Sequence, residues 1–487
     1  MKRNLLSMIV VVLCVFATSI SAKPSEKQLK LVANGMVEAL NSNDLKQREI
    51  FLLNHYINAD SASAIERWQG HFLRYNEILG NIQIHEIDLS DSALIKLLIK
   101  TTNPRAISQW SYLIINMDSE TPEKFRSFGL EPAQDPKIVL PNRPLTDDEI
   151  KYFVGQFIDD LVSRDVFSGS VILTKEGKEV FSGTYGEADK QWHIKNNLET
   201  KFNLGSMNKM FTGVAICQLV EKGKLDFDAT VGTYLPEYPN KDIREKVKIH
   251  HLLTHTSGMD SYWDAMAKMD WTALRTVEDF ARLSYNDSLL FEPGAEFHYS
   301  NAGPLVLGLI IEKVTDMDYH DYIREHVTGP AGMVNTDCYN NDDIIPNLAH
   351  GYYWDDEMNV YHSNIFEHSA RGSAAGGGYS TAIDLQRFAK ALYDGTLLSP
   401  EMLKTYTTGK VEMGPNDFYA YLISEEVWDG IKSVGHGGGA PGINSDLKIF
   451  PEIGYTISAM SNYDTGASAI GSYVAHLLAH GRPAITE

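Results

Sequence analysis

A serine and a lysine three residues apart, Ser206 and Lys209, stand at the start of a segment with helical spacing. Side chains three residues apart share a helix face, so the Lys209 amine can reach the Ser206 hydroxyl. A hydroxyl is a weak nucleophile until a neighbouring base takes its proton. The pair therefore predicts nucleophilic catalysis by Ser206, and a helix start also supplies free backbone N–H groups for a developing negative charge.

The spacing alone is a weak signal, because Ser-x-x-Lys occurs by chance where a serine caps a helix and the lysine is solvated. The surrounding sequence strengthens it. Apolar residues recur at helical spacing over residues 206–219, and Gly223 then offers a stop signal. We therefore expect Ser206 at the entrance of a helix.

A second group, Tyr299 and Asn301, lies between a Pro-Gly turn signal and an apolar helical run over residues 304–314. We expect both residues on a loop at a helix entrance. A lysine ammonium beside Tyr299 would lower the pKa of its phenol and allow it to relay protons. The alternative reading is a core tyrosine and a helix-capping asparagine.

A third group, His436 followed by Gly437, Gly438 and Gly439, falls in a predicted strand that leads to a hairpin over residues 446–460. Glycines there would let a substrate backbone approach closely. The same string matches the oxyanion loop of lipases with the α/β-hydrolase fold. That fold also needs a Gly-x-Ser-x-Gly elbow after the loop, and the chain contains no complete one.

Together the three groups resemble the serine β-lactamase and penicillin-binding protein superfamily. The resemblance is closer to its class C-like branch, which holds esterases, D-aminopeptidases and D-alanyl-D-alanine carboxypeptidases. That branch carries Ser-x-x-Lys, Tyr-x-Asn, and Lys-Thr-Gly or His-x-Gly in this order. Residues 249–259 and 376–382 also resemble sequence segments of this family. The resemblance extends over about residues 145–480.

The resemblance implies a role for each catalytic candidate. Ser206 would be the acylated nucleophile, and Lys209 and Tyr299 would share the work of the general base. Tyr299 would later protonate the leaving group. Asn301 would bind the substrate or hold Lys209 in place. Water would then hydrolyse the acyl-enzyme.

The third motif would bind substrate through His436 and Gly438. The backbone N–H groups of Ser206 and Gly439 would form the oxyanion hole. Members that hydrolyse penicillins usually carry lysine where this chain has His436, which is mostly neutral at pH 7. The histidine form resembles the esterase and D-aminopeptidase side of the family.

Other chemistries find little support in the sequence. His250, His251 and His255 lie close together, but no His-Glu-x-x-His pattern accompanies them, and no phosphate-binding loop is present. We predict no cofactor and no metal. The formal net charge of −21 argues against nucleic acid as a partner. The expected partner is a small-molecule ester or peptide substrate.

Residues 1–22 are typical of a secretory signal: Lys2 and Arg3 precede an apolar run and small residues that end at Ala22. We predict cleavage after Ala22, a periplasmic or secreted protein, and no stable membrane insertion. Cys217 and Cys338 remain after cleavage, and whether they pair is open.

The predicted fold class is α/β, with a β-lactamase-like antiparallel sheet flanked by helices and a mainly helical subdomain over residues 145–482. Residues 138–144 form a predicted linker. Residues 24–137 show three helical stretches followed by four strand-like runs. This order resembles the NTF2-like cone, a small α+β domain.

We therefore expect an exported serine hydrolase that acts through an acyl-enzyme on an ester, a small amide or a D-amino-acid peptide. A β-lactamase or a cell-wall D-Ala-D-Ala carboxypeptidase is the alternative within the same chemistry. A binding or sensor protein that captures its ligand without turnover is the alternative of another class.

Overall fold

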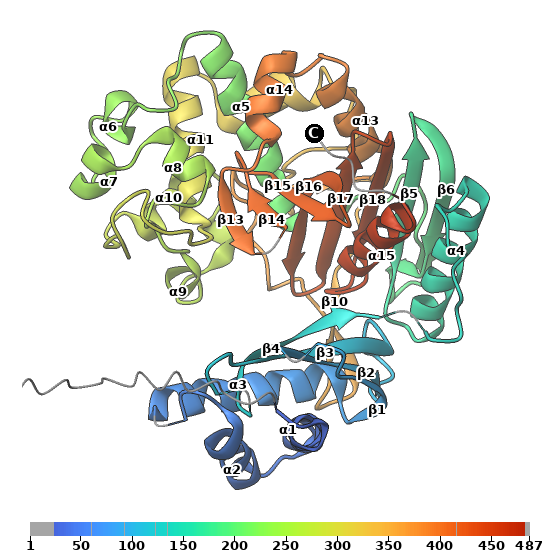
Figure 1. The fold of residues 1–487 in the computed structure, drawn as a ribbon. Coiled ribbons are helices and arrows are strands. Elements are labelled where there is room, and N and C mark those ends of the chain that lie inside the picture. Colours follow the sequence, from blue (N-terminus) through green and yellow to red (C-terminus); the bar gives the residue numbers. More distant parts are fainter. Residues whose placement is uncertain are drawn as a thin grey trace, which may run out of the picture. The chain divides into compact units, whose positions relative to one another are not determined.

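The computed structural model describes residues 24–59, 61–91, 93–121, 123–133, 135–414 and 416–482 (Figure 1). The predicted signal, residues 1–22, lies outside them. The chain divides into two compact units, Met1–Val139 and Leu140–Glu487. Among the described helices, none is both long enough and apolar enough to cross a bilayer.

The first unit consists of three helices followed by an antiparallel meander whose strand order is β1-β2-β3-β4. Its elements are α1 (Glu26–Asn41), α2 (Leu45–His55), α3 (Ala62–Leu79), β1 (Ile82–Asp88), β2 (Leu94–Thr101), β3 (Trp110–Met117) and β4 (Phe125–Pro132). Alternate residues of β2 and β3, such as Ile95, Leu97 and Leu113, are buried in one core with apolar residues of the three helices. The predicted order of helices and strands is confirmed, and the NTF2-like assignment stays a prediction.

The second unit is built on an eight-stranded antiparallel sheet of order β13-β14-β15-β16-β17-β18-β5-β6. Its strands are β13 (Val411–Gly414), β14 (Asp417–Tyr419), β15 (Ser424–Trp428), β16 (Ile431–Ala440), β17 (Ile443–Phe450), β18 (Tyr455–Ser461), β5 (Gly169–Lys175) and β6 (Lys178–Tyr185). The C-terminal hairpin β17–β18 pairs with β5, and β5 pairs with β6. All of these pairs are antiparallel, which confirms the predicted antiparallel sheet.

Helices pack on the sheet as the predicted fold class requires. The helix α4 (Asp147–Ser163) begins with a capping box between Thr146 and Glu149 and packs on β6. The helix α15 (Ala467–Ala479) packs on β17 and β18, and α13 (Ala382–Tyr393) packs on β18 and β5. The Ser458 hydroxyl of β18 donates to the Ala382 carbonyl at the start of α13, which anchors that helix to the sheet.

Two largely buried helices follow the candidate residues Ser206 and Asn301. In α5 (Asn208–Glu221) every residue from Asn208 to Leu219 is buried, and α11 (Ala302–Thr315) is nearly as enclosed. A helix that is apolar all round belongs to the interior of a domain. Both pack within the mainly helical part of the chain that also holds α8 (Ile249–Leu253), α10 (Val277–Ala281) and α12 (Tyr319–Ile323) (Figure 1). The turn that contains Ser206 leads into α5, and Asn301 directly precedes α11.

Candidate active site

Ser206 lies in a 3-10 turn, Gly205–Met207, that leads directly into α5. Gly205 adopts a positive φ of 51°, and its N–H donates to the Asn203 side chain over 2.9 Å. Among the described residues, the Ser206 N–H donates to no protein group. Ser206 is partly exposed, so a hydroxyl and a free N–H are available at the predicted helix entrance.

The Lys209 side chain is fully buried one turn later, with a relative exposure of 0%. Its Nζ lies 3.1 Å from Ser206 Oγ, 2.7 Å from Asn301 Oδ1 and 2.6 Å from the Ala375 carbonyl oxygen. Burial disfavours the ammonium and lowers the pKa of Lys209 to about 7. A neutral amine has two N–H groups, which match the two oxygens of Asn301 and Ala375, and one lone pair, which is left for the Ser206 hydroxyl.

Tyr299 and Asn301 lie at the entrance of α11, as predicted. The Asn301 side chain does not cap the helix. Its oxygen accepts from Lys209, and its Nδ2 donates to Ser261 Oγ over 3.3 Å. Of the two functions expected for Asn301, holding Lys209 is therefore the one that its contacts match.

The Tyr299 ring centroid lies 4.9 Å from Lys209 Nζ. Burial raises the pKa of Tyr299 to about 12, and a side-chain hydrogen bond with Ser206 lowers it only in part. The expectation that Lys209 lowers this pKa is wrong, because the same burial that encloses the phenol also removes the charge from the amine. Tyr299 is protonated near neutral pH and can donate a proton.

Residues 373–375 hold the start of α5 through three consecutive carbonyl groups. The Ser373 carbonyl accepts from Asn208, the Ala374 carbonyl from Thr212, and the Ala375 carbonyl from Lys209. These contacts could not be predicted from the sequence, because a residue of any type supplies a backbone carbonyl. The only sequence feature that pointed to this region was the neighbouring glycine-rich segment, residues 376–382, which resembles the family.

The strand β16 carries the third motif past the Ser206 turn. β15 pairs with β16 only as far as Gly435, so the edge beyond that residue is free of a strand partner on that side. In the two-residue hairpin with β17, Ala440 opposes Ile443 and Gly439 opposes Asn444. The alternation of an antiparallel pair then directs the Gly439 N–H toward the free edge. A Cβ built on Gly205 would lie 2.9 Å from the Gly439 nitrogen, so this N–H lies beside the Ser206 turn.

His436 is buried and uses both ring nitrogens within the protein. Its Nε2 lies 3.0 Å from the Tyr419 hydroxyl, and its Nδ1 bonds to the Gly437 carbonyl. Burial lowers the pKa of His436 to about 4, with a smaller effect from Lys209, so the ring is neutral at pH 7. His255 and Tyr419 were absent from the predicted site, although His255 lies in one of the family-like phrases.

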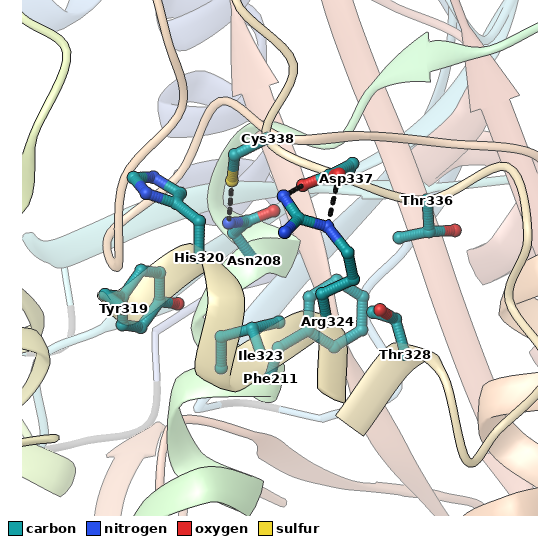
Figure 2. A pocket seen from close by; sticks show the side chains of 10 residues that line it. All are labelled: Asn208, Phe211, Tyr319, His320, Ile323, Arg324, Thr328, Thr336, Asp337 and Cys338. Atoms are coloured by element: carbon teal, nitrogen blue, oxygen red, sulfur yellow. Dashed lines mark hydrogen bonds and ion pairs between the residues drawn. The ribbon is translucent and has the colours of Figure 1, made fainter. Parts of the chain in front are cut away.

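The described residues contain no group of three or more His, Cys, Asp and Glu side chains arranged for a metal ion. Figure 2 shows a small cavity beside α5, of about 10 Å³, where the Asn208 amide donates to the Cys338 thiol over 3.2 Å. This volume suits a water molecule at most. Cys217 and Cys338 are both buried and unpaired, which settles the question of a bridge between them.

The β-lactamase family model matches residues 154–480 of this chain. The chain belongs to the β-lactamase family. The predicted superfamily and fold class are thereby confirmed, and the chain is a serine hydrolase of this family. The match includes all three motifs, and it excludes the α/β-hydrolase alternative.

Three relatives show how far the family likeness extends. Penicillin-binding protein 4* of Bacillus subtilis (strain 168) is 28% identical over 322 residues, which cover 62% of this chain and 70% of that protein. A penicillin-binding protein structure from Bacillus halodurans is 30% identical with a TM-score of 0.60, and the match covers 68% of this chain and 98% of that one. A D-amino acid amidase structure from Ochrobactrum anthropi SV3, with D-phenylalanine bound, is 24% identical with a TM-score of 0.58 and the same coverage.

The β-lactamase fold therefore serves proteins with different named ligands, and the fold alone does not choose the substrate.

The close approach of β16 to the Ser206 turn predicts different outcomes for two adjacent glycines. A Cβ on Gly438 would lie 1.9 Å from the Leu204 carbonyl oxygen, whereas a Cβ on Gly439 would meet nothing closer than 4.0 Å. We expect Gly438→Ala to lower the free energy of unfolding by about 1–3 kcal/mol through overpacking. Gly439→Ala should melt like the unmodified protein in thermal denaturation. Equal melting temperatures for the two variants would contradict this packing.

Proposed function

We propose that this chain is an exported serine hydrolase that forms an acyl-enzyme on Ser206 from an ester, a small amide or a D-amino-acid peptide. The observation that carries the proposal is the environment of Lys209. Its amine is buried, has two carbonyl acceptors for its two N–H groups, and lies 3.1 Å from Ser206 Oγ. Such an amine is a base directed at one hydroxyl.

In the proposed acylation, Lys209 takes the proton of Ser206 while Oγ forms a bond to the substrate carbonyl carbon. The N–H groups of Ser206 and Gly439 stabilise the oxyanion, a contribution of about 3 kcal/mol for a single donor of this kind. Tyr299 gives its proton to the leaving group as the carbonyl bond to that group breaks. The ammonium of Lys209 then restores the proton to Tyr299, and water completes the hydrolysis.

The proposed substrate is uncharged where it meets the third motif. His436 is neutral, and both of its ring nitrogens are occupied by protein groups, so it offers no cation for a substrate carboxylate. This supports an ester or an amide over a substrate held by its C-terminal carboxylate. The free edge of β16 would bind an extended acyl group through backbone hydrogen bonds.

Acylation by penicillin is a second candidate activity, supported by the two relatives that are penicillin-binding proteins. We expect it to be slow, because a neutral His436 replaces the permanent cation that suits the penicillin carboxylate. The proposal that the protein is exported depends only on the predicted signal, residues 1–22. The mass of the mature protein would show whether the chain is cleaved after Ala22.

The nucleophile is tested by labelling with a fluorophosphonate probe and by intact-mass detection of the adduct. We expect one adduct on the unmodified chain and none on Ser206→Ala, because no other described serine has a buried amine as its base. Turnover of a chromogenic short-chain ester should fall to background in the same variant. Ser163→Ala, at an exposed serine at the end of α4, is the matched control and should label fully. An adduct that persists in Ser206→Ala would refute the proposal.

The pKa of about 7 for Lys209 predicts the pH dependence of acylation. Below that value the amine is protonated and cannot accept the Ser206 proton, so kcat/KM should fall about tenfold for each pH unit. Above it, kcat/KM should reach a plateau. The measurement is a pH–rate profile with an uncharged ester.

The fall in kcat/KM at low pH is the acidic limb of the profile. The variant Asn301→Asp tests whether this limb reports the titration of Lys209. It places a carboxylate about where the amide oxygen lies 2.7 Å from Nζ, and a carboxylate favours the ammonium. The limb should move to higher pH by about 1–3 units. Ser261→Ala removes the two hydrogen bonds that Asn301 donates to Ser261 Oγ but adds no charge, so it should leave the limb in place. A limb that does not move in Asn301→Asp would assign the titration to another group.

A further inference from the structure

A buried chain of hydrogen bonds joins the second motif to the third behind the site. The Ser300 N–H donates to Nδ1 of His255 over 3.3 Å. Nε2 of His255 lies 3.0 Å from the Tyr419 hydroxyl, which lies 3.0 Å from Nε2 of His436. Nδ1 of His436 bonds to the Gly437 carbonyl. We call these three side chains, His255, Tyr419 and His436, the histidine relay.

The two backbone groups that bond to the relay, the Ser300 N–H and the Gly437 carbonyl, fix the direction of every hydrogen bond within it. A backbone N–H only donates, so Nδ1 of His255 accepts and the ring proton sits on Nε2. That proton is donated to Tyr419, whose hydroxyl proton is then donated to Nε2 of His436. The proton of His436 must sit on Nδ1, where it meets a carbonyl that only accepts. Starting from the Gly437 carbonyl gives the same assignment, so the network is consistent from either end.

The relay depends on both histidines being neutral, and their burial provides this. His255 is 0% exposed and His436 is 8% exposed. Burial lowers the pKa of His255 well below its usual value and the pKa of His436 to about 4. Each ring therefore carries one proton at pH 7, and the relay has a single arrangement.

A second observation sets His255 apart from an ordinary core residue. Its φ is 55°, in the left-handed region that a residue other than glycine enters at a cost of about 1–2 kcal/mol. Backbone strain of this kind persists where the surroundings require one side-chain position. The His255 ring centroid lies 4.3 Å from that of Tyr299, so one side chain touches the second motif and reaches the third through Tyr419.

We propose that His255 and Tyr419 are positioning residues of the hydrolase, which lock His436 in its Nδ1–H tautomer and so orient the Gly437 carbonyl and the strand edge that carries Gly439. His436 then acts as a support for the strand and not as a ligand of the substrate. The effect on turnover rests on the function proposed above. The tautomers do not depend on it.

The test is two-dimensional NMR of the full chain labelled with ¹⁵N-histidine, which reports the protonated nitrogen of each ring. At pH 7 we expect His436 to be protonated on Nδ1 and His255 on Nε2, with signals assigned by loss in His436→Gln and His255→Gln. Tyr419→Phe removes one hydroxyl and keeps the ring. It should leave Nε2 of His436 without its hydrogen-bond donor, shift the ¹⁵N signal of that nitrogen, and lower kcat/KM of the ester about tenfold, mainly in kcat.

The matched control is Tyr463→Phe. Tyr463 is also buried, and its hydroxyl donates to Asp165 over 2.7 Å outside the relay. This variant should lose a comparable amount of thermal stability but leave the histidine signals and kcat/KM unchanged. The contrast separates positioning from a general loss of packing.

The proposal is overturned if the unmodified protein shows His436 protonated on Nε2, or if Tyr419→Phe leaves kcat/KM and the ¹⁵N signal of His436 Nε2 unchanged. The unmodified protein decides the tautomers even if Tyr419→Phe does not fold. Activity that persists in Ser206→Ala would refute the proposed function while the NMR result for the relay stands.

Discussion

The rest of the structure depends on the burial of one amine. An ammonium away from water is costly, so Lys209 must be neutral or have a partner for every N–H. Its partners come from distant parts of the chain: Asn301 is 92 residues away and Ala375 is 166 residues away. The helical part that carries α11 and the loop at residues 373–375 must therefore both dock on α5 before the site exists.

The same turn also limits the side chains around it. A Cβ on Gly376 would lie 2.9 Å from the Gly205 carbonyl oxygen, and a Cβ on Gly438 would lie closer still to that of Leu204. Two segments therefore pass Ser206 at distances that only glycine allows. Their backbone groups, and not their side chains, lie beside the Ser206 turn. That arrangement explains how a loop and a strand can both approach a turn that is also open to a substrate.

The sequence predicted side chains that the structure brings together at the Ser206 turn, but not the contacts that depend on the backbone or on burial. Ser206, Lys209, Tyr299 and Asn301 were predicted from spacing and order, and the sheet from the family resemblance. The Ala375 carbonyl could not be predicted, because any residue supplies one. The direction of the pKa shift at Tyr299 was wrong, because it depends on whether burial outweighs a nearby amine, which only packing decides. His255 lies in the family-like segment 249–259. Its hydrogen-bond connection to His436 passes through Tyr419, which belongs to no motif in the sequence.

Burial separates the pKa values of two groups that would titrate close together in water. The usual pKa values of lysine and tyrosine are both near 10, so neither would be a selective base or acid at pH 7. Enclosure removes charge from both, which lowers the pKa of Lys209 to about 7 and raises that of Tyr299 to about 12. Between these values the amine is free to accept a proton while the phenol still holds one to donate. No carboxylate is needed for this separation, because desolvation acts in opposite directions on a cation and on a neutral acid. A site of this kind works only while water is kept from Lys209, which ties the chemistry directly to the packing of α5.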